Sequence, residues 1–171
     1  MPEMLASVSA NAAAGRFNLL CIHSDVLVKL GRTDDALKEA REALALAERL
    51  QTQPELGLSN KPGYLAAALV RVGRIDEAIA AGRHHVELAS ASTQTRARWS
   101  RDLALARIYA LARRPRENVA LLAKLLLVPS RITVPMLRID PDWDNVREDP
   151  AFKAPVGRSK KVGAALRIGL V

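Results

Sequence analysis

The sequence contains few aromatic residues and almost no cysteine. Its 171 residues include two tryptophans, two tyrosines and two phenylalanines, so an apolar core must be built mainly from aliphatic side chains. Alanine and leucine supply most of these, and both are strong helix formers, which favours an all-helical chain. The single cysteine, Cys21, excludes an internal disulfide and suits a reducing compartment.

Signals for export and for membrane insertion are also lacking. The first basic residue is Arg16, and residues 1–14 lack the charged start and the long apolar run of a secretory signal. The longest apolar stretches, residues 64–70 and residues 119–128 with Lys124 interrupting the second, are too short to span a bilayer. We therefore expect a soluble, cytoplasmic protein without a membrane partner.

The motifs that accompany catalysis are missing from the sequence. It has no phosphate-binding glycine loop, nucleophile elbow or cofactor fingerprint, so we expect no enzymatic activity, no catalytic residues and no cofactor. His84 and His85, together with His23 and Cys21, are potential metal ligands, but the spacing of a zinc site is absent. No metal site is predicted, and His85 is interpreted as a packed core residue.

Three aspartates near the C-terminus alternate as they do in a calcium-binding loop. These are Asp140, Asp142 and Asp144. The loop also needs a glycine and a glutamate, and Asn145 and Ala151 stand in their places. We interpret the aspartates as residues that cap short helices.

The sequence does contain an internal repeat. Residues 30–37, Leu-Gly-Arg-Thr-Asp-Asp-Ala-Leu, recur 42 residues later as Val-Gly-Arg-Ile-Asp-Glu-Ala-Ile, and a weaker copy follows after 40 more. Gly31 and Gly73 allow the left-handed conformation that ends a helix, and the acidic pair suits the first turn of the next helix. The octet predicts a helix-turn-helix unit. The third copy has Arg113 in place of glycine, so a less ideal turn is expected there.

The residues around the turns have helical periodicity. After the first turn, apolar residues follow one helix face, and His85 takes the place of Ala43 after the second turn. One helix pair cannot bury its apolar face alone, so about three pairs must stack. The stripe after the first turn consists of Ala36, Leu37, Ala40, Ala43, Leu44, Ala47 and Leu50.

This pattern resembles the tetratricopeptide repeat. The resemblance implies an all-α fold, a right-handed α-solenoid of about three antiparallel helix pairs. The pairs are expected at about 17–50, 60–91 and 97–128 of an array spanning residues 1–128, with a loop at 51–62 because the usual period is nearer 34. The matching residues are Gly31, Asp34, Asp35, Ala36 and Ala43 in copy one, Gly73, Asp76, Glu77 and Ala78 in copy two, and Ala106 and Tyr109 in copy three.

The residues after the repeats predict a cap and a tail. Residues 129–155 are expected to form short helices that cover the apolar end of the array. Residues 156–171 are expected to form a basic tail that is either flexible or contains one short helix at 162–170. The segment resembles the tail that follows such repeats in bacterial multidomain signalling proteins, which implies that the chain is the sensor or scaffold end of one. The covering residues are expected to be Met136, Leu137, Trp143, Val146 and Phe152.

The resemblance implies a non-catalytic scaffold that binds a protein or peptide. In such arrays the first helix of each pair lines a concave groove, and Lys29 and Arg71 occupy equivalent places there, so an acidic or extended peptide is the expected partner. Alternatively, these are only the polar residues that any exposed groove has. The groove positions are Asn18, Asp25 and Lys29 in copy one, Asn60, Ala67 and Arg71 in copy two, and Leu103 and Arg107 in copy three.

Charge supplies a rival hypothesis. The net charge is +8, and residues 90–116 contain seven arginines against one acid, Asp102. Such a cluster is able to contact nucleic-acid phosphates, or it is simply a solvated helix face. Trp99 is the only aromatic residue nearby apart from Tyr109, which the register assigns to the core. Support from base stacking is therefore thin.

Overall fold

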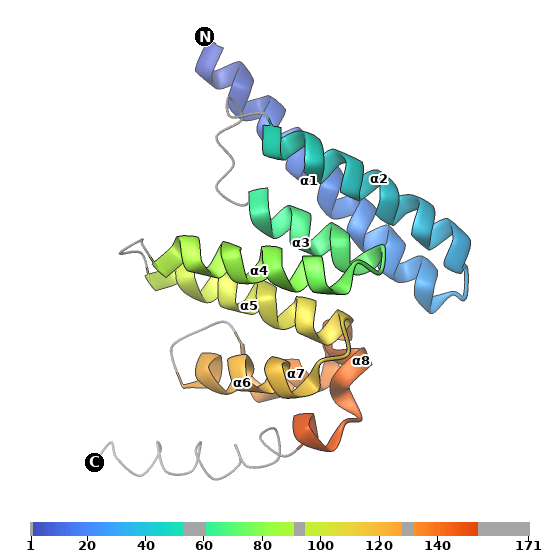
Figure 1. The fold of residues 1–171 in the computed structure, drawn as a ribbon, viewed down its shortest axis with the longest axis vertical. Helices are drawn as coiled ribbons and strands as arrows, with labels where there is room; N and C mark the ends of the chain where they lie inside the picture. Colours follow the sequence, from blue (N-terminus) through green and yellow to red (C-terminus); the bar gives the residue numbers. More distant parts are fainter. Residues whose placement is uncertain (1, 53–60, 91–94, 128–131, 154–171) are drawn as a thin grey trace. The chain divides into compact units, whose positions relative to one another are not determined.

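All regular structure in the described part of the chain is helical. The computed structural model describes residues 2–52, 61–90, 95–127 and 132–153, and these contain no strand, which confirms the predicted all-α class. The chain forms two compact units, Met1–Leu88 and Ala89–Val171. The helices (Figure 1) are α1 (Pro2–Lys29), α2 (Thr33–Thr52), α3 (Lys61–Arg71), α4 (Ile75–Ser90), α5 (Thr95–Leu111), α6 (Pro115–Leu126), α7 (Val134–Ile139), the 3-10 helix η2 (Pro141–Trp143) and α8 (Asp144–Arg147).

The three octets form the same turn. After α1, the Gly31 N–H donates to the Val28 carbonyl oxygen at 3.0 Å and the Arg32 N–H donates to the Leu27 carbonyl oxygen at 2.9 Å, the hydrogen bonds of a Schellman motif. The same two bonds recur after α3, from Gly73 to Val70 and from Arg74 to Leu69, and after α5, from Arg113 to Ala110 and from Arg114 to Tyr109.

Arg113 takes the backbone conformation of the two glycines. Its φ is 54°, beside 74° for Gly31 and 83° for Gly73, and no other non-glycine residue in the described part has a positive φ. The third turn therefore keeps the hydrogen bonds of the other two. This turn is less ideal only because Arg113, which has a Cβ, adopts the left-handed conformation. That conformation costs about 1–2 kcal/mol.

The helix that follows each of the three turns has the same pattern of buried residues. In α2 the residues three, seven and ten places after Thr33 are buried, and the equivalent residues of α4 and α6 are buried as well. His85 is 4% exposed at the place of Ala43, which confirms that it is packed. The recurring buried residues are Ala36, Ala40 and Ala43, then Ala78, Gly82 and His85, then Asn118, Leu122 and Leu125.

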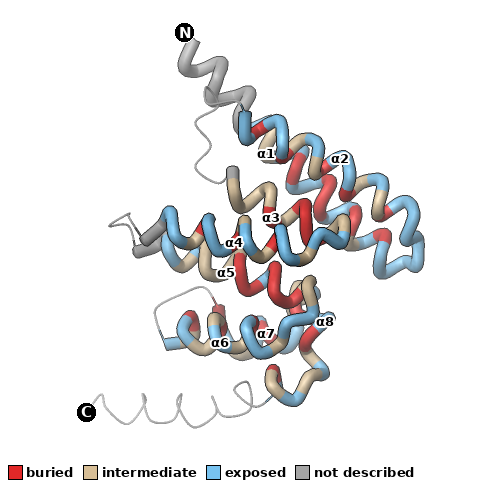
Figure 2. The backbone as a smooth tube through the Cα atoms, in the orientation of Figure 1, coloured by how far each residue is buried: buried red, intermediate tan, exposed pale blue. Residues whose placement is uncertain are grey.

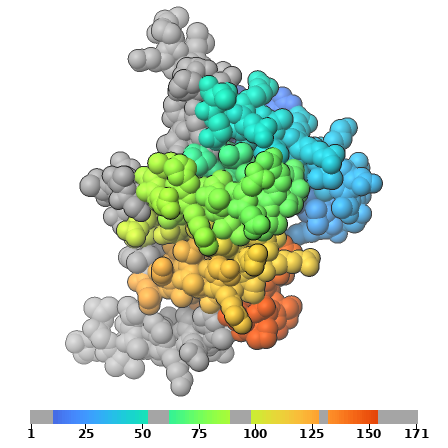
Figure 3. Space-filling view, in the orientation of Figure 1, coloured from blue at the N-terminus to red at the C-terminus, as the bar shows by residue number. Residues whose placement is uncertain are grey.

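The core of the first unit lies between α1, α2 and α3. α1 packs against α2, and α3 packs against both. Figure 2 shows buried residues recurring along the facing sides of α1 and α2, and in Figure 3 α2 hides most of α1. The rings of Phe17 and Tyr64 join α1 to α3, with centroids 4.8 Å apart. Phe17 shares a buried cluster with Leu20, Cys21, Ala43, Ala47 and Ala68.

The core of the second unit lies between α5, α6 and the short helices that follow. Trp143 and Phe152 are its largest fully buried side chains, and they join Ala106, Ala110, Leu122, Leu125, Ile132, Leu137 and Val146. Four of the five residues expected to cover the apolar end are therefore buried. The expectation for Met136 is wrong, because Met136 is 38% exposed. In the six-residue α7, Leu137 faces the core. Met136 precedes it, so its side chain points about 100° away around the helix.

The aspartates of this segment act in part as caps. The Asp140 carboxylate accepts a hydrogen bond of 3.0 Å from the Asp142 N–H at the start of η2, and the Asp149 carboxylate accepts one of 2.8 Å from the Ala151 N–H. The sequence-based interpretation of Asp140 as a capping residue is confirmed. Such bonds satisfy backbone N–H groups that a helix start leaves unpaired.

Candidate functional site

The predicted groove residues of copy one lie on one face of α1. Asn18 and Lys29 are exposed and Asp25 is half-buried. They are separated by seven and four residues, which brings side chains to the same side of a helix. Asn60, predicted for copy two, lies outside the described residues.

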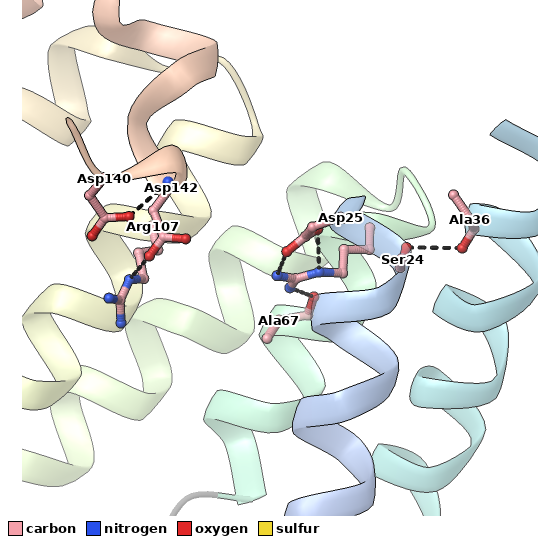
Figure 4. A network of polar contacts seen from close by, with 8 residues as sticks. Ser24, Asp25, Ala36, Ala67, Arg107, Asp140 and Asp142 are labelled. Carbon is pink, nitrogen blue, oxygen red and sulfur yellow. Dashed lines mark hydrogen bonds and ion pairs between the residues drawn. The ribbon is translucent and has the colours of Figure 1, made fainter. Parts of the chain in front are cut away.

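Asp25 and Arg71 form a bidentate ion pair between α1 and α3. The Arg71 Nε donates to Asp25 Oδ1 at 2.9 Å, and Arg71 Nη2 donates to Asp25 Oδ2 at 2.7 Å. The third nitrogen, Nη1, donates to the Ala67 carbonyl oxygen at 2.7 Å. Figure 4 labels the two residues that accept these bonds, Asp25 and Ala67, and marks the bonds with dashed lines. Three of the predicted groove positions thus meet at one point of the first unit.

This pair changes the electrostatics expected of the groove face. The side chain of Arg71 is 15% exposed and that of Asp25 is 36% exposed, so the two charges neutralise each other where water screens them only partly. The guanidinium fork matches a carboxylate, which makes the contact specific as well as strong. Arg71 therefore joins α1 to α3, and its charge does not contribute to the predicted basic character of the groove face.

A second arginine predicted for the groove also has an internal acid. In the second unit, the Arg107 Nε lies 2.5 Å from Asp142 Oδ2, in the segment where Asp140 caps η2 (Figure 4). Leu103, the other predicted residue of copy three, is half-buried and packs against the core of this unit. Sequence spacing did not reveal the Arg107 partner, because Asp142 comes from the capping segment.

The arginine cluster of the second unit is largely exposed. Arg101 is half-buried, and the side chain of Arg96 lies outside the described residues. Trp99 is half-buried against the core and Tyr109 is 5% exposed, so neither is a fully exposed platform for base stacking. The exposed members are Arg98, Arg107, Arg113, Arg114 and Arg116.

Burial changes the acidity of two groups. Desolvation raises the pKa of the Asp102 carboxyl, while Arg98 and Lys124 act in the opposite direction. Desolvation also raises the pKa of the Cys21 thiol, opposed by the positive charge of Arg71. A buried thiol with a raised pKa is a poor nucleophile. Cys21 is accordingly a packing residue of the first core.

The potential metal ligands do not come together. His84 is exposed and His85 is buried, and the described residues contain no group of three or more His, Cys, Asp or Glu side chains able to hold a metal ion. Within the same ranges, no helix combines the length and the apolar character needed to cross a membrane.

Sequence reasoning missed an exposed apolar stripe on α1. Leu19, Ile22, Val26 and Leu30 are 69%, 60%, 46% and 66% exposed. They occur at spacings of three and four residues, so they share one face of the helix. The same spacing in the sequence was the signal available for finding it.

Comparisons with protein-family models, with curated proteins and with solved structures found no match. The likeness to a helical repeat therefore rests on the chain's own residues, namely its three equivalent turns and the burial that recurs with them.

Proposed function

We propose that the chain is a tetratricopeptide-like array, a right-handed solenoid of antiparallel helix pairs, that acts as a non-catalytic scaffold for a peptide or a partner protein. The observation that carries the proposal is the recurrence of one turn with the same hydrogen bonds, followed each time by the same pattern of buried residues. A repeat of this kind stacks equivalent helices and leaves equivalent faces exposed.

The groove face of α1 is the proposed binding surface in the first unit. Asn18 and Lys29 are exposed on it, and the Asp25–Arg71 pair fixes α1 against α3 beside them. A surface whose helices are already fixed loses little entropy when it binds. Lys29 supplies a positive charge and Asn18 supplies an amide, so an extended or acidic peptide is the proposed ligand.

The proposal includes a cellular context. The chain would be the sensor or scaffold end of a bacterial signalling protein, and the repeats would present a partner to a separate signalling module. This part rests on the resemblance of residues 129–155 to the tail of such proteins. It predicts a kinase, cyclase or DNA-binding module in the same protein or in one encoded beside it.

Nucleic-acid binding is the competing function. The exposed Arg98, Arg113, Arg114 and Arg116 favour it, because each phosphate contact adds an increment of affinity that falls with salt. Two observations weigh against it. Arg107 is bound to Asp142, and Trp99 is half-buried against the core.

A direct test separates the two functions. Labelled acidic, neutral and basic peptides of about 12 residues, long enough to extend along several helix turns, are titrated with the full chain in parallel with a single-stranded oligonucleotide. We expect the acidic peptides to bind best and Lys29→Glu to weaken them about tenfold. Lys38→Glu, at an exposed position of α2, is the matched control and should leave binding unchanged.

Two other sets of results would favour nucleic-acid binding or contradict peptide binding in the groove. Tight oligonucleotide binding that falls steeply with salt, and that the triple change Arg113→Glu, Arg114→Glu and Arg116→Glu abolishes, would favour the nucleic-acid function. Failure of every peptide to bind, or equal weakening by Lys29→Glu and Lys38→Glu, would contradict the groove proposal.

A further inference from the structure

The apolar stripe of α1 lies on the side of the helix opposite its core contacts. Phe17, Leu20 and Cys21 face the core of the first unit, whereas Leu19, Ile22, Val26 and Leu30 are exposed. Isolated exposed leucines are ordinary, but a contiguous apolar helix face usually marks a docking surface.

The equivalent face of α3, 42 residues later in the repeat, is used for helix packing. At the offset of 42 residues, Ile22 corresponds to Tyr64 and Val26 to Ala68. In α3 these two residues pack against the preceding helices, since Ala68 is fully buried in the first core and the Tyr64 ring contacts Phe17. The equivalent face of α1 is therefore built for helix packing, and no described helix covers it.

The spacing of the stripe suits packing against an identical helix. Leu19, Ile22 and Val26 alternate by three and four residues, the a and d spacing of a coiled-coil seam. Ala12 and Gly15 continue this spacing and are exposed, and a Cβ at Gly15 would meet no atom within 4 Å. Small residues in the seam allow two helices to approach closely. In the sequence, Leu5 and Val8 extend the same pattern.

The charges on the side of the stripe that faces α2 do not oppose this contact. The chain carries a net charge of +8, so two copies repel each other overall. At this surface, however, Arg16 is bound to Glu42, and His23 Nδ1 lies 3.2 Å from Glu39 Oε1. The border beside α2 thus carries no excess of positive charge, and the stripe itself is uncharged.

We propose that this face docks a second copy of the chain, with α1 packed against α1 of the copy in a two-fold symmetric dimer. A two-fold contact uses the same patch on both partners, which an alternating a and d stripe satisfies. The proposal is independent of the peptide groove. The dimer would place the groove faces of the two copies next to the shared seam and so allow bivalent binding.

The experiment measures the mass of the full chain in solution by sedimentation or light scattering. Wild type is expected to have twice the chain mass of 18.6 kDa at about 100 µM, and the double variant Ile22→Glu, Val26→Glu is expected to be monomeric, with the dimer dissociation constant raised more than about a hundredfold. The control is Val28→Glu, since Val28 is 59% exposed on the same helix but lies off the stripe. It should remain dimeric.

Circular dichroism checks that each variant keeps its helicity. If the double glutamate variant loses helicity, Ile22→Ser with Val26→Ser replaces it. A wild type that is monomeric at that concentration, including one whose stripe captures a different protein, overturns the proposal. So does a stripe variant that folds and stays dimeric, or a Val28→Glu variant that dissociates as readily.

Discussion

The side-chain amide of Asn118 donates a hydrogen bond of 2.7 Å to the carbonyl oxygen of Ala106. In the first copy, Ser24 stands at the place of Ala106 and Ala36 at the place of Asn118. There the Ser24 hydroxyl donates a hydrogen bond of 2.9 Å to the carbonyl oxygen of Ala36. The donor sits on the second helix in one case and on the first helix in the other. Both bonds tie the two helices of a pair together at the same point.

The identity of residue 118 should therefore matter more than its size. Asn118→Ala loses one hydrogen bond and is expected to cost about 1 kcal/mol, because Ala36 and Ala78 show that alanine fits this place. Asn118→Asp keeps the shape but has no N–H to donate, and it buries a charge against a carbonyl oxygen. We expect a loss of more than about 3 kcal/mol at neutral pH. Urea unfolding measures both, and equal stability of the aspartate variant would refute the assignment.

The third turn should become more stable when its residue is glycine. Arg113 has a φ of 54°, so Arg113→Gly relieves the left-handed strain and is expected to raise the free energy of unfolding by about 1 kcal/mol, less the added entropy of glycine in the unfolded chain. Gly73→Ala is the reciprocal control and should lower it by a similar amount. Thermal unfolding of both variants is the measurement, and opposite signs are required.

The Asp25–Arg71 pair should show a coupling energy. Asp25→Ala and Arg71→Ala each leave one charge without its main partner, while the double variant removes both. We expect the cycle to give a coupling of about 1–2 kcal/mol, larger than for an exposed pair because Arg71 is 15% exposed. The exposed Arg32–Asp35 pair is the comparison. Its coupling should be smaller and more sensitive to salt.

A glycine in α3 should be intolerant of alanine. Gly63 lies against the buried His85, and a Cβ there would come within 2.9 Å of the imidazole Nε2. Gly63→Ala normally favours a helix by about 1 kcal/mol, but here we expect destabilisation. Adding His85→Ala should restore much of the loss, since the contact is then gone. A stabilised single variant would show that the imidazole moves aside without cost.

The raised pKa of Asp102 gives a pH dependence of defined sign. Burial raises this pKa in the folded chain, so the ionised form lowers stability at neutral pH and the penalty disappears once the pH falls below the ordinary value of 3.8. Asp102→Asn should therefore be more stable than wild type at pH 7 and similar to it below about pH 3.8.

Glu77 provides the opposite control. Its pKa is lowered by a hydrogen bond with Arg74, so its contribution is present above the ordinary value of 4.5 and is lost as the pH falls further. Glu77→Gln should lower stability at pH 7, and the difference should shrink in acid. Unfolding curves recorded across this range test both variants, and the same sign for the two would contradict the assignments.

Local features of the fold could be predicted from the sequence, and contacts between distant segments could not. Gly31, Gly73 and the acidic pairs specify the turns through short-range conformation and helix-end electrostatics. Arg113 was expected to make its turn less ideal, and it does so through its left-handed φ of 54° while the hydrogen bonds of the turn stay the same as in the other two. The backbone geometry is set by the helices on both sides, and the arginine adapts to it.

The candidate site shows the same division. The register placed Asp25 and Arg71 on equivalent first helices, but their side chains are 46 residues apart in sequence, and no periodicity indicates that they bind each other. The exposed stripe of α1 was missed for a related reason. An apolar helix pattern shows that a face is suited to packing, and it does not show which of two faces already has a neighbour.

The buried face of α2 determines how the first unit responds to mutation. Ala36, Ala40, Ala43 and Ala47 are at most 3% exposed, so four of the five fully buried side chains of α2 are methyl groups, and the fifth is Leu50 near the end of the helix. Trimming any one of them to glycine removes little volume, whereas a larger side chain such as valine forces neighbouring backbones apart. Glycine inside a helix is itself destabilising by about 0.5–1 kcal/mol, so alanine is expected to persist along this face, and a larger residue is expected only where the opposite helix loses bulk, as Gly63 does beside His85.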